Sequence, residues 1–276
     1  MMEQANHEID FFFREGENNV LMVFLSGFGG TCAYLDYKHI IDCIPDYIGI
    51  LALDRFGYGK STHSIEDRTL SNTSSEIDSV LIKLKLIEKT IIFVTHSLSG
   101  IYILDYINRY ERTIIGLIFI EPTTRYSIEQ LPHLREEIIF NSKLVQYLRQ
   151  NTDLDLFSII PLEVDVNPHL KEAEKKEYIF RLKSNFLNVT LTNEINESEK
   201  NIVEASNYII SDSVPVLLFT RECREVEYNN SNYLNSHNSS RIVSYSNGTH
   251  HIHWSNGKEV INEIKQFLEN LLNCWL

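Results

Sequence analysis

The sequence runs Thr90-Ile91-Ile92-Phe93-Val94-Thr95-His96-Ser97-Leu98-Ser99-Gly100 at the point that decides the fold. β-Branched and aromatic residues predict a buried strand up to Thr95, and the residues after Gly100 have the apolar spacing of a helix. Ser97 is therefore expected where a strand turns sharply into a helix. A reactive serine at such a turn needs small residues two positions before and after it, and here Thr95 and Ser99 replace the usual glycines.

Two interpretations of Ser97 are open from this stretch alone. The first is a nucleophile whose hydroxyl points outward at the edge of a sheet. The second is a serine that caps an ordinary helix after a strand, because serine oxygens commonly accept hydrogen bonds from the first N–H groups of a helix. The choice depends on partners elsewhere in the chain, and these favour the nucleophile.

Short apolar runs alternate with stretches of helical spacing, which predicts an α/β fold with a mostly parallel sheet flanked by helices. The predicted strands are Glu8–Phe13, Asn19–Leu25, Ile48–Leu53, Thr90–Thr95, Ile114–Ile120, Val214–Phe219 and Arg241–Tyr245. The predicted helices are Ser71–Leu86, with a capping box at Thr73-Ser74-Ser75-Glu76, Ser97–Tyr110 and Lys258–Leu272. Together they form one core from residues 1–125 and 213–276.

Residues 126–212 interrupt this alternation. They hold no convincing strand and carry charged helical stretches at Leu131–Gln150 and Lys171–Leu187. Because no linker rich in Pro, Gly or Ser isolates the segment, we expect a helical cap, or lid, packed on the carboxyl edge of the sheet. The Asn-rich stretch Tyr228–Ser240 is expected to be a long loop.

A glycine-rich loop, Ser26-Gly27-Phe28-Gly29-Gly30, follows the second predicted strand. Glycine lets backbone N–H groups approach a ligand closely, and an oxyanion needs two such donors. We assign this oxyanion hole to the backbone N–H groups of Phe28 and Leu98, with a plain glycine-rich turn as the alternative. A second glycine stretch, Gly57–Thr62, looks like the end of a phosphate-binding loop, but Asp54 stands where that motif needs its first glycine.

The sequence reads Asn247-Gly248-Thr249-His250-His251-Ile252-His253-Trp254 between the last strand and the last helix. A histidine on such a loop can reach over the sheet edge and take the proton of a serine, so His250 is the candidate general base. The histidine cluster also raises a metal site as an alternative. Because no Cys, Asp or Glu accompanies it at ligand spacing, we expect no metal. A purely structural role is the remaining alternative for His250.

Composition and charge exclude several other classes of function. The chain has 276 residues and a formal net charge of −13, with no stripe of Lys and Arg, so nucleic acid and anionic lipid are not expected partners. No apolar run is long enough to cross a bilayer and the first residues lack a leader pattern, so we expect a cytoplasmic protein. Unpaired spacing indicates free thiols at Cys32, Cys43, Cys223 and Cys274.

With these segments in this order, the chain resembles the α/β-hydrolase superfamily over nearly its whole length. The similarity is strongest at Phe24–Gly30, Leu53–Ser61, Phe93–Gly100 and Gly248–Trp254. The resemblance implies an eight-stranded sheet, one early strand beyond those given above, with a helical cap inserted after the sixth strand. It also implies that Asp54 and Arg55 shape the entrance of the site and that the first histidine of the last segment, His250, is catalytic.

The acid departs from the family's pattern. Relatives commonly place an aspartate where this chain has Arg224, and they begin the oxyanion loop with His-Gly rather than Ser26-Gly27. Some relatives take their acid from the end of the preceding strand, where this chain has Glu121. A carboxylate there could accept the imidazole N–H and stabilise the imidazolium. Glu121 is the preferred acid, and the alternatives are Glu222, Glu225 or a site with no acid.

These residues predict a serine hydrolase that cleaves an ester-like or small amide bond of a small-molecule substrate. Ser97, Glu121 and His250 would form the triad of an acyl-enzyme mechanism. Dehalogenases and epoxide hydrolases of similar fold instead use an aspartate at the turn. No cofactor is expected, and the chain is expected to be a monomer or homodimer.

Two alternative functions remain. The first is an aminopeptidase of the proline iminopeptidase type, which would need cap carboxylates to hold a substrate amine, with candidates at Glu136, Glu137, Glu163 and Asp165. The second is a non-catalytic member of the fold that binds a small molecule. It is suggested by the altered oxyanion loop and the missing aspartate.

Overall fold

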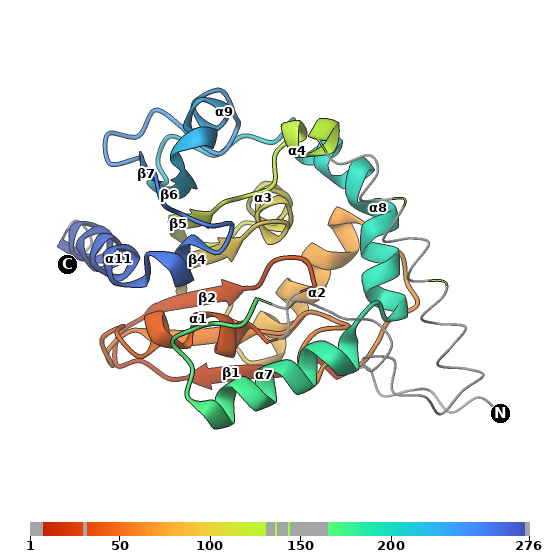
Figure 1. Cartoon of the computed structure of the whole chain (residues 1–276). Helices are drawn as coiled ribbons and strands as arrows, with labels where there is room; N and C mark the ends of the chain where they lie inside the picture. The colour runs from red at the N-terminus through yellow and green to blue at the C-terminus, as the bar shows by residue number, and fades with distance from the viewer. Residues whose placement is uncertain (1–7, 30–31, 131–135, 137–142, 144–164, 274–276) are drawn as a thin grey trace.

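The computed structural model describes residues 8–29, 32–130, 136, 143 and 165–273 (Figure 1). In these residues a seven-stranded sheet has the order β1-β3-β2-β4-β5-β6-β7. Its strands are β1 (Phe11–Arg14), β2 (Val20–Leu25), β3 (Gly49–Leu53), β4 (Thr90–His96), β5 (Ile114–Ile120), β6 (Val216–Arg221) and β7 (Arg241–Tyr245). Only the β1–β3 pair is antiparallel. The predicted mostly parallel α/β sheet is therefore confirmed, whereas the described residues show no eighth strand.

Helices cover both faces of the sheet, which explains why β2 and β3 are buried along their whole length. One face packs against α1 (Ala33–Ile41) and α11 (Gly257–Asn273), and the other against α2 (Leu70–Lys83) and α3 (Ser99–Arg109) (Figure 1). The helix predicted at Lys258–Leu272 is confirmed as α11, with Ile264 and Phe267 buried in the core. Each such fully buried side chain contributes about 1.5–3 kcal/mol to folding.

The start of α2 corrects the predicted capping box. The cap is Thr69, whose side chain accepts a hydrogen bond from the Asn72 N–H at 3.2 Å. Glu76 does not cap the helix, because its carboxylate accepts from the Phe56 N–H at 2.6 Å and pairs with Arg68 at 2.6 Å. The Glu76 carboxylate, which the sequence pattern assigned to the start of the helix, therefore binds a buried arginine and a loop N–H instead.

Among the described residues, the longer helical elements between β5 and β6 are α4 (Arg125–Gln130), α7 (Glu172–Asn185) and α8 (Val189–Ala205). The helical stretch predicted at Lys171–Leu187 is confirmed as α7, and α8 packs against α3 and α4 (Figure 1). The stretch Leu131–Gln150 falls outside the described residues except for positions 136 and 143. The division of the chain at residues 126 and 212 stays a prediction.

The remaining elements are short and lie after β6 and β7. They are the 3₁₀-helix η1 (Glu222–Arg224), α9 (Glu225–Asn229) and α10 (Ile252–Ser255). The strand predicted at Val214–Phe219 begins and ends two residues later, at Val216 and Arg221. Cys32, Cys43 and Cys223 are free thiols, and Cys274 lies outside the described residues. Within the described part of the chain, no helix combines the length and apolarity that crossing a membrane requires.

Candidate active site

Ser97 lies in the turn between β4 and α3, with a left-handed φ of 53°. Its N–H donates to the Ile120 carbonyl at 3.0 Å, and its carbonyl accepts from the Thr123 N–H at 3.1 Å. The predicted helix began at Ser97, but α3 begins at Ser99 and is preceded by Leu98, which makes no side-chain capping bond. Ser97 therefore does not cap α3, and its backbone is held in a conformation that L-residues rarely adopt.

The two residues that replace glycine around Ser97 are accommodated in different ways. The Ser99 hydroxyl accepts from the His96 N–H at 3.1 Å and lies 3.0 Å from the Leu25 carbonyl, to which it can donate. Thr95 is fully buried, and its hydroxyl has no hydrogen-bond partner among the described residues. Close packing at the turn is kept by Gly100, where an added Cβ would lie 3.1 Å from the Pro122 side chain.

The glycine loop after β2 lies directly against this turn. A Cβ added at Gly27 would come within 3.0 Å of Ser97 Cβ and 2.8 Å of His96 Nδ1, so only glycine fits there. The proposed oxyanion donors, the N–H groups of Phe28 and Leu98, make no hydrogen bond within the described part of the chain. Gly30 lies outside the described residues.

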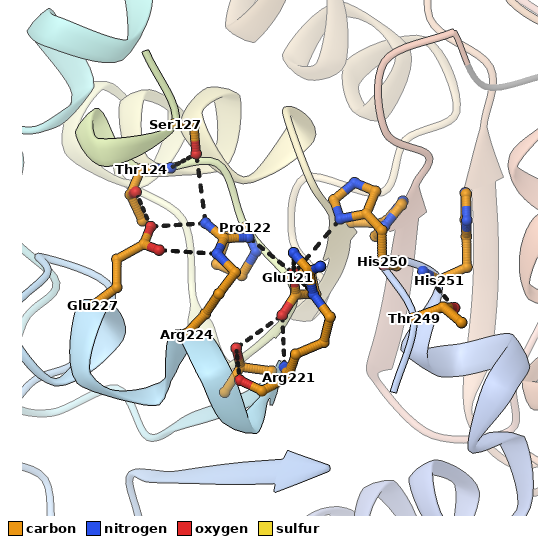
Figure 2. A network of polar contacts seen from close by, with 12 residues as sticks. Glu121, Pro122, Thr124, Ser127, Arg221, Arg224, Glu227, Thr249, His250 and His251 are labelled. Carbon is orange, nitrogen blue, oxygen red and sulfur yellow. Dashed lines mark hydrogen bonds and ion pairs between the residues drawn. The ribbon is translucent and has the colours of Figure 1, made fainter. Parts of the chain in front are cut away.

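Among the three candidate acids, Glu121 is the one that the structure places beside His250. Its Oε2 atom lies 3.6 Å from His250 Nδ1, and its side chain is fully buried at the end of β5 (Figure 2). Glu225 instead accepts a hydrogen bond from the Ser244 hydroxyl at 2.6 Å, and Glu222 is exposed in η1.

Two arginines also bind the Glu121 carboxylate (Figure 2). Oε1 accepts from the Thr220 hydroxyl at 2.8 Å and from the Arg221 N–H at 2.7 Å. Oε2 accepts from Arg221 Nε at 3.0 Å and from Arg224 Nη1 at 2.9 Å. Burial alone would raise the pKa of Glu121, but hydrogen bonds from His250 and the Arg221 N–H and the charge of Arg224 lower it to about 2. The carboxylate is therefore ionised at neutral pH.

Sequence reasoning did not identify Arg221, Thr220 or His96 as part of this site. A buried carboxylate at a strand end needs hydrogen-bond donors. The one signal for them in the sequence was Arg224, an arginine at the position where relatives commonly have an aspartate.

His96 is 5% exposed, and its Nε2 atom lies 2.9 Å from the His250 carbonyl. Because a carbonyl only accepts, this ring nitrogen carries the proton. Burial holds the pKa of His96 well below its usual value, so the ring is neutral.

The remaining loop histidines surround His96. The ring centroids of His250, His251 and His253 lie 4.7, 5.0 and 4.9 Å from that of His96. His251 Nδ1 also lies 3.6 Å from Oδ2 of Asp165, which precedes α7. Among the described residues, no group of three His, Cys, Asp or Glu side chains has the arrangement of metal ligands.

Arg55, which follows β3, connects the glycine loop after β2 with α8. Arg55 Nη1 donates to the Ser26 carbonyl at 2.7 Å, and Nη2 pairs with Glu194 of α8 at 3.1 Å. The same carboxylate accepts from the hydroxyls of Tyr58 and Tyr102. The segment that resembles the family's entrance loop is thus buried and structural.

In the described residues, no hydrogen bond joins the Ser97 hydroxyl to the His250 ring. Such contacts are often long before a substrate binds and tighten in the reactive complex. The site therefore has a partly buried turn serine, a loop histidine and an ionised carboxylate at one edge of the sheet.

Comparison with known proteins gives one curated relative and many solved structures. No family model matches the chain. The uncharacterized protein YqjL of Bacillus subtilis is 29% identical over 109 residues, which are 40% of this chain and 42% of that protein. The match thus spans less than half of the curated relative.

The solved structures match over almost the whole chain. Smu.1393c of Streptococcus mutans is 24% identical, covers 96% of this chain and 93% of its own, and has a TM-score of 0.66. MenH of S. aureus is 18% identical, with 97% of this chain and 100% of MenH covered and a TM-score of 0.67. A thermophilic esterase of Thermogutta terrifontis is 15% identical, with 95% of this chain and 93% of the esterase covered and a TM-score of 0.65. The protein therefore has the fold of the α/β-hydrolase superfamily.

Proposed function

We propose that this protein is a serine hydrolase that cleaves an ester-like bond of a small molecule through an acyl-enzyme intermediate. The observation that carries the proposal is the φ of 53° at Ser97, between a parallel strand and the helix that follows it. A non-glycine residue in this conformation costs stability, and such strain is concentrated at functional sites. The hydrolases and esterases among proteins of this fold support the same reaction class.

Each step has a candidate residue. His250 takes the proton of the Ser97 hydroxyl as the hydroxyl attacks the substrate carbonyl. The N–H groups of Phe28 and Leu98 donate to the oxyanion, while Glu121 accepts from the imidazolium and stabilises it. His250 then protonates the leaving group and afterwards activates the water that releases the acyl group.

One contact favours aminopeptidase activity as a second candidate function. Asp165, a cap carboxylate, pairs with His251 next to the proposed base and could hold a substrate amine. Its side chain is 83% exposed, so the charge is well solvated without a ligand. Glu136 is exposed, and Glu137 and Glu163 lie outside the described residues. Ester cleavage is the first choice because it requires only the residues around Ser97.

The test combines covalent labelling with two substrate classes. We expect a fluorophosphonate to label the protein, and short p-nitrophenyl esters to be hydrolysed faster than aminoacyl p-nitroanilides. Ser97→Ala should abolish labelling and turnover, whereas Ser75→Ala, at an exposed serine of α2, should retain both. Turnover retained by Ser97→Ala would refute the assignment, a preference for the anilides would favour the aminopeptidase, and tight ligand binding without labelling would favour the non-catalytic alternative.

A further inference from the structure

A single oxygen of the proposed acid is shared by three donors. Oε2 of Glu121 lies 2.9 Å from Arg224 Nη1, 3.0 Å from Arg221 Nε and 3.6 Å from His250 Nδ1 (Figure 2). In a Ser-His-acid site the carboxylate stabilises the imidazolium that forms during the reaction. Here both guanidinium groups are closer to that oxygen than the imidazole is.

The Arg224 side chain is fixed in place rather than loosely paired. Its Nε and Nη2 atoms donate to the two oxygens of Glu227 at 2.9 and 2.7 Å, and Glu227 also accepts from the Thr124 hydroxyl (Figure 2). The guanidinium carbon lies 4.9 Å from the centre of the Tyr228 ring. A two-point pair and a stacked ring give an arginine a defined orientation, so its charge stays at Glu121.

Charges around His250 come from several elements. Glu121 ends β5, Arg221 and Arg224 follow from β6 and η1, and Asp165 approaches through His251. The histidine neighbours of His250 are His96 of β4, His251 of the loop and His253 of α10. Burial lowers the pKa of each of these three rings, so they are neutral at pH 7. Because Asp165 is largely exposed and screened, the two arginines are the main charges that oppose the attraction of Glu121 for an imidazolium.

We propose that Arg224 is a positioning residue for the acid, which holds the Glu121 carboxylate in place and weakens its attraction for the His250 imidazolium. This inference rests on the proposed roles of Ser97 and His250. The consequence is that the imidazolium formed when His250 accepts the serine proton is stabilised less than it would be beside an unshared carboxylate.

The pH dependence of kcat/KM for ester hydrolysis tests the proposal. In Arg224→Gln, the acid-side fall in activity should move to higher pH by about one unit, because a positive charge near the imidazolium is lost. Arg224→Lys keeps the positive charge, so its acid-side fall in activity should lie within a few tenths of a pH unit of that of the wild type. The control is Arg241→Gln, which removes an arginine paired with Glu263 and should not move the profile. An unmoved profile in Arg224→Gln would overturn the proposal.

A second measurement is independent of catalysis. In a Ser97→Ala background, the NMR titration midpoint of the His250 ring, assigned by comparison with His250→Gln, should rise in Arg224→Gln by the same amount. Arg221→Gln should raise it less, because the Arg221 side chain is 34% exposed and more screened than Arg224 at 15%. These midpoints test Arg224 even if Ser97 proves not to be the nucleophile. Should neither substitution raise the midpoint, the inference is wrong.

Discussion

Ser97 and Glu121 end the neighbouring strands β4 and β5 with positive φ angles of 53° and 44°. Hydrogen bonds join the two turns, from the Ser97 N–H to the Ile120 carbonyl and from the Thr123 N–H to the Ser97 carbonyl. A left-handed backbone costs an L-residue about 1–2 kcal/mol. The sharp strand-to-helix turn expected at Ser97 implied a strained backbone there. The positive φ at Glu121 was not predicted, because apolar spacing carries no information on φ.

This strain predicts an unusual response to glycine at position 97. Both Ser97→Gly and Ser97→Ala should be inactive, but Ser97→Gly should be more stable than Ser97→Ala by about 1 kcal/mol, because glycine adopts a positive φ without a steric penalty. Equilibrium unfolding in urea measures the difference. The same pair at Ser75, inside α2, should show the opposite order by about 1 kcal/mol, since alanine favours a helix. Equal stabilities at position 97 would contradict the strain.

At the scale of elements, polar side chains of α8 and its N-cap bind backbone carbonyls of the core, in addition to the apolar residues that α8 buries. Asn188 Nδ2 donates to the Gly57 carbonyl at 2.8 Å, and Asn201 Nδ2 donates to the Arg68 carbonyl at 2.7 Å. At Gly57, which has a φ of 82°, an added Cβ would lie 2.6 Å from Thr190 of α8. Hydrophobic spacing could not reveal these contacts, because their partners are backbone groups of a distant loop.

Glu194 should be the most costly side chain of α8 to change. It is fully buried and binds Arg55, Tyr58 and Tyr102. Glu194→Gln keeps the shape but leaves Arg55 without its counter-ion, so we expect a loss of about 3 kcal/mol in the free energy of unfolding, measured in urea. Lys200→Gln changes an exposed charge on the same helix and should cost less than about 0.5 kcal/mol. Similar losses in both variants would mean that the buried pair does not stabilise the attachment of α8.

At the scale of the whole molecule, the sequence predicted the fold better than the polar contacts of the site. The seven strands were found because each contains a short apolar run, and the five inner strands, β2 to β6, are buried between helices. The candidates Ser97 and His250 followed from their places after a strand and before the last helix, whereas Glu121 was proposed from the resemblance to a known family. The arginines on Glu121 and the capping role of Thr69 did not, since both depend on which buried donor reaches which acceptor in the folded chain.

Buried titratable groups give the stability of the molecule opposing dependences on pH. Burial lowers the pKa of His39 and His251 from 6.5 to about 4, and it also holds the pKa of His96 and His253 well below 6.5. Between these values and 6.5 the unfolded chain binds more protons, so stability falls as pH falls below 6.5. Burial raises the pKa of Asp36 to about 8 and of Asp54 to about 7. At pH values above 3.8, the ordinary pKa of an aspartate, the folded chain binds more of these protons than the unfolded chain does. Stability therefore falls as pH rises.

Asp36→Asn separates the two effects. In the wild type, the Asp36 contribution to stability is lost at about 1.4 kcal/mol per unit as pH rises from 3.8 to about 8, whereas asparagine has no charge to bury. The stability of the variant relative to the wild type should therefore rise by about 3 kcal/mol between about pH 5 and about pH 7.5, as measured by urea unfolding. Asp46→Asn, whose side chain is 93% exposed, should show the same difference at both pH values. If Asp36→Asn also gave a constant difference, Asp36 would be ionised in the folded protein, and the alkaline loss of stability would have to come from other buried acids such as Asp54.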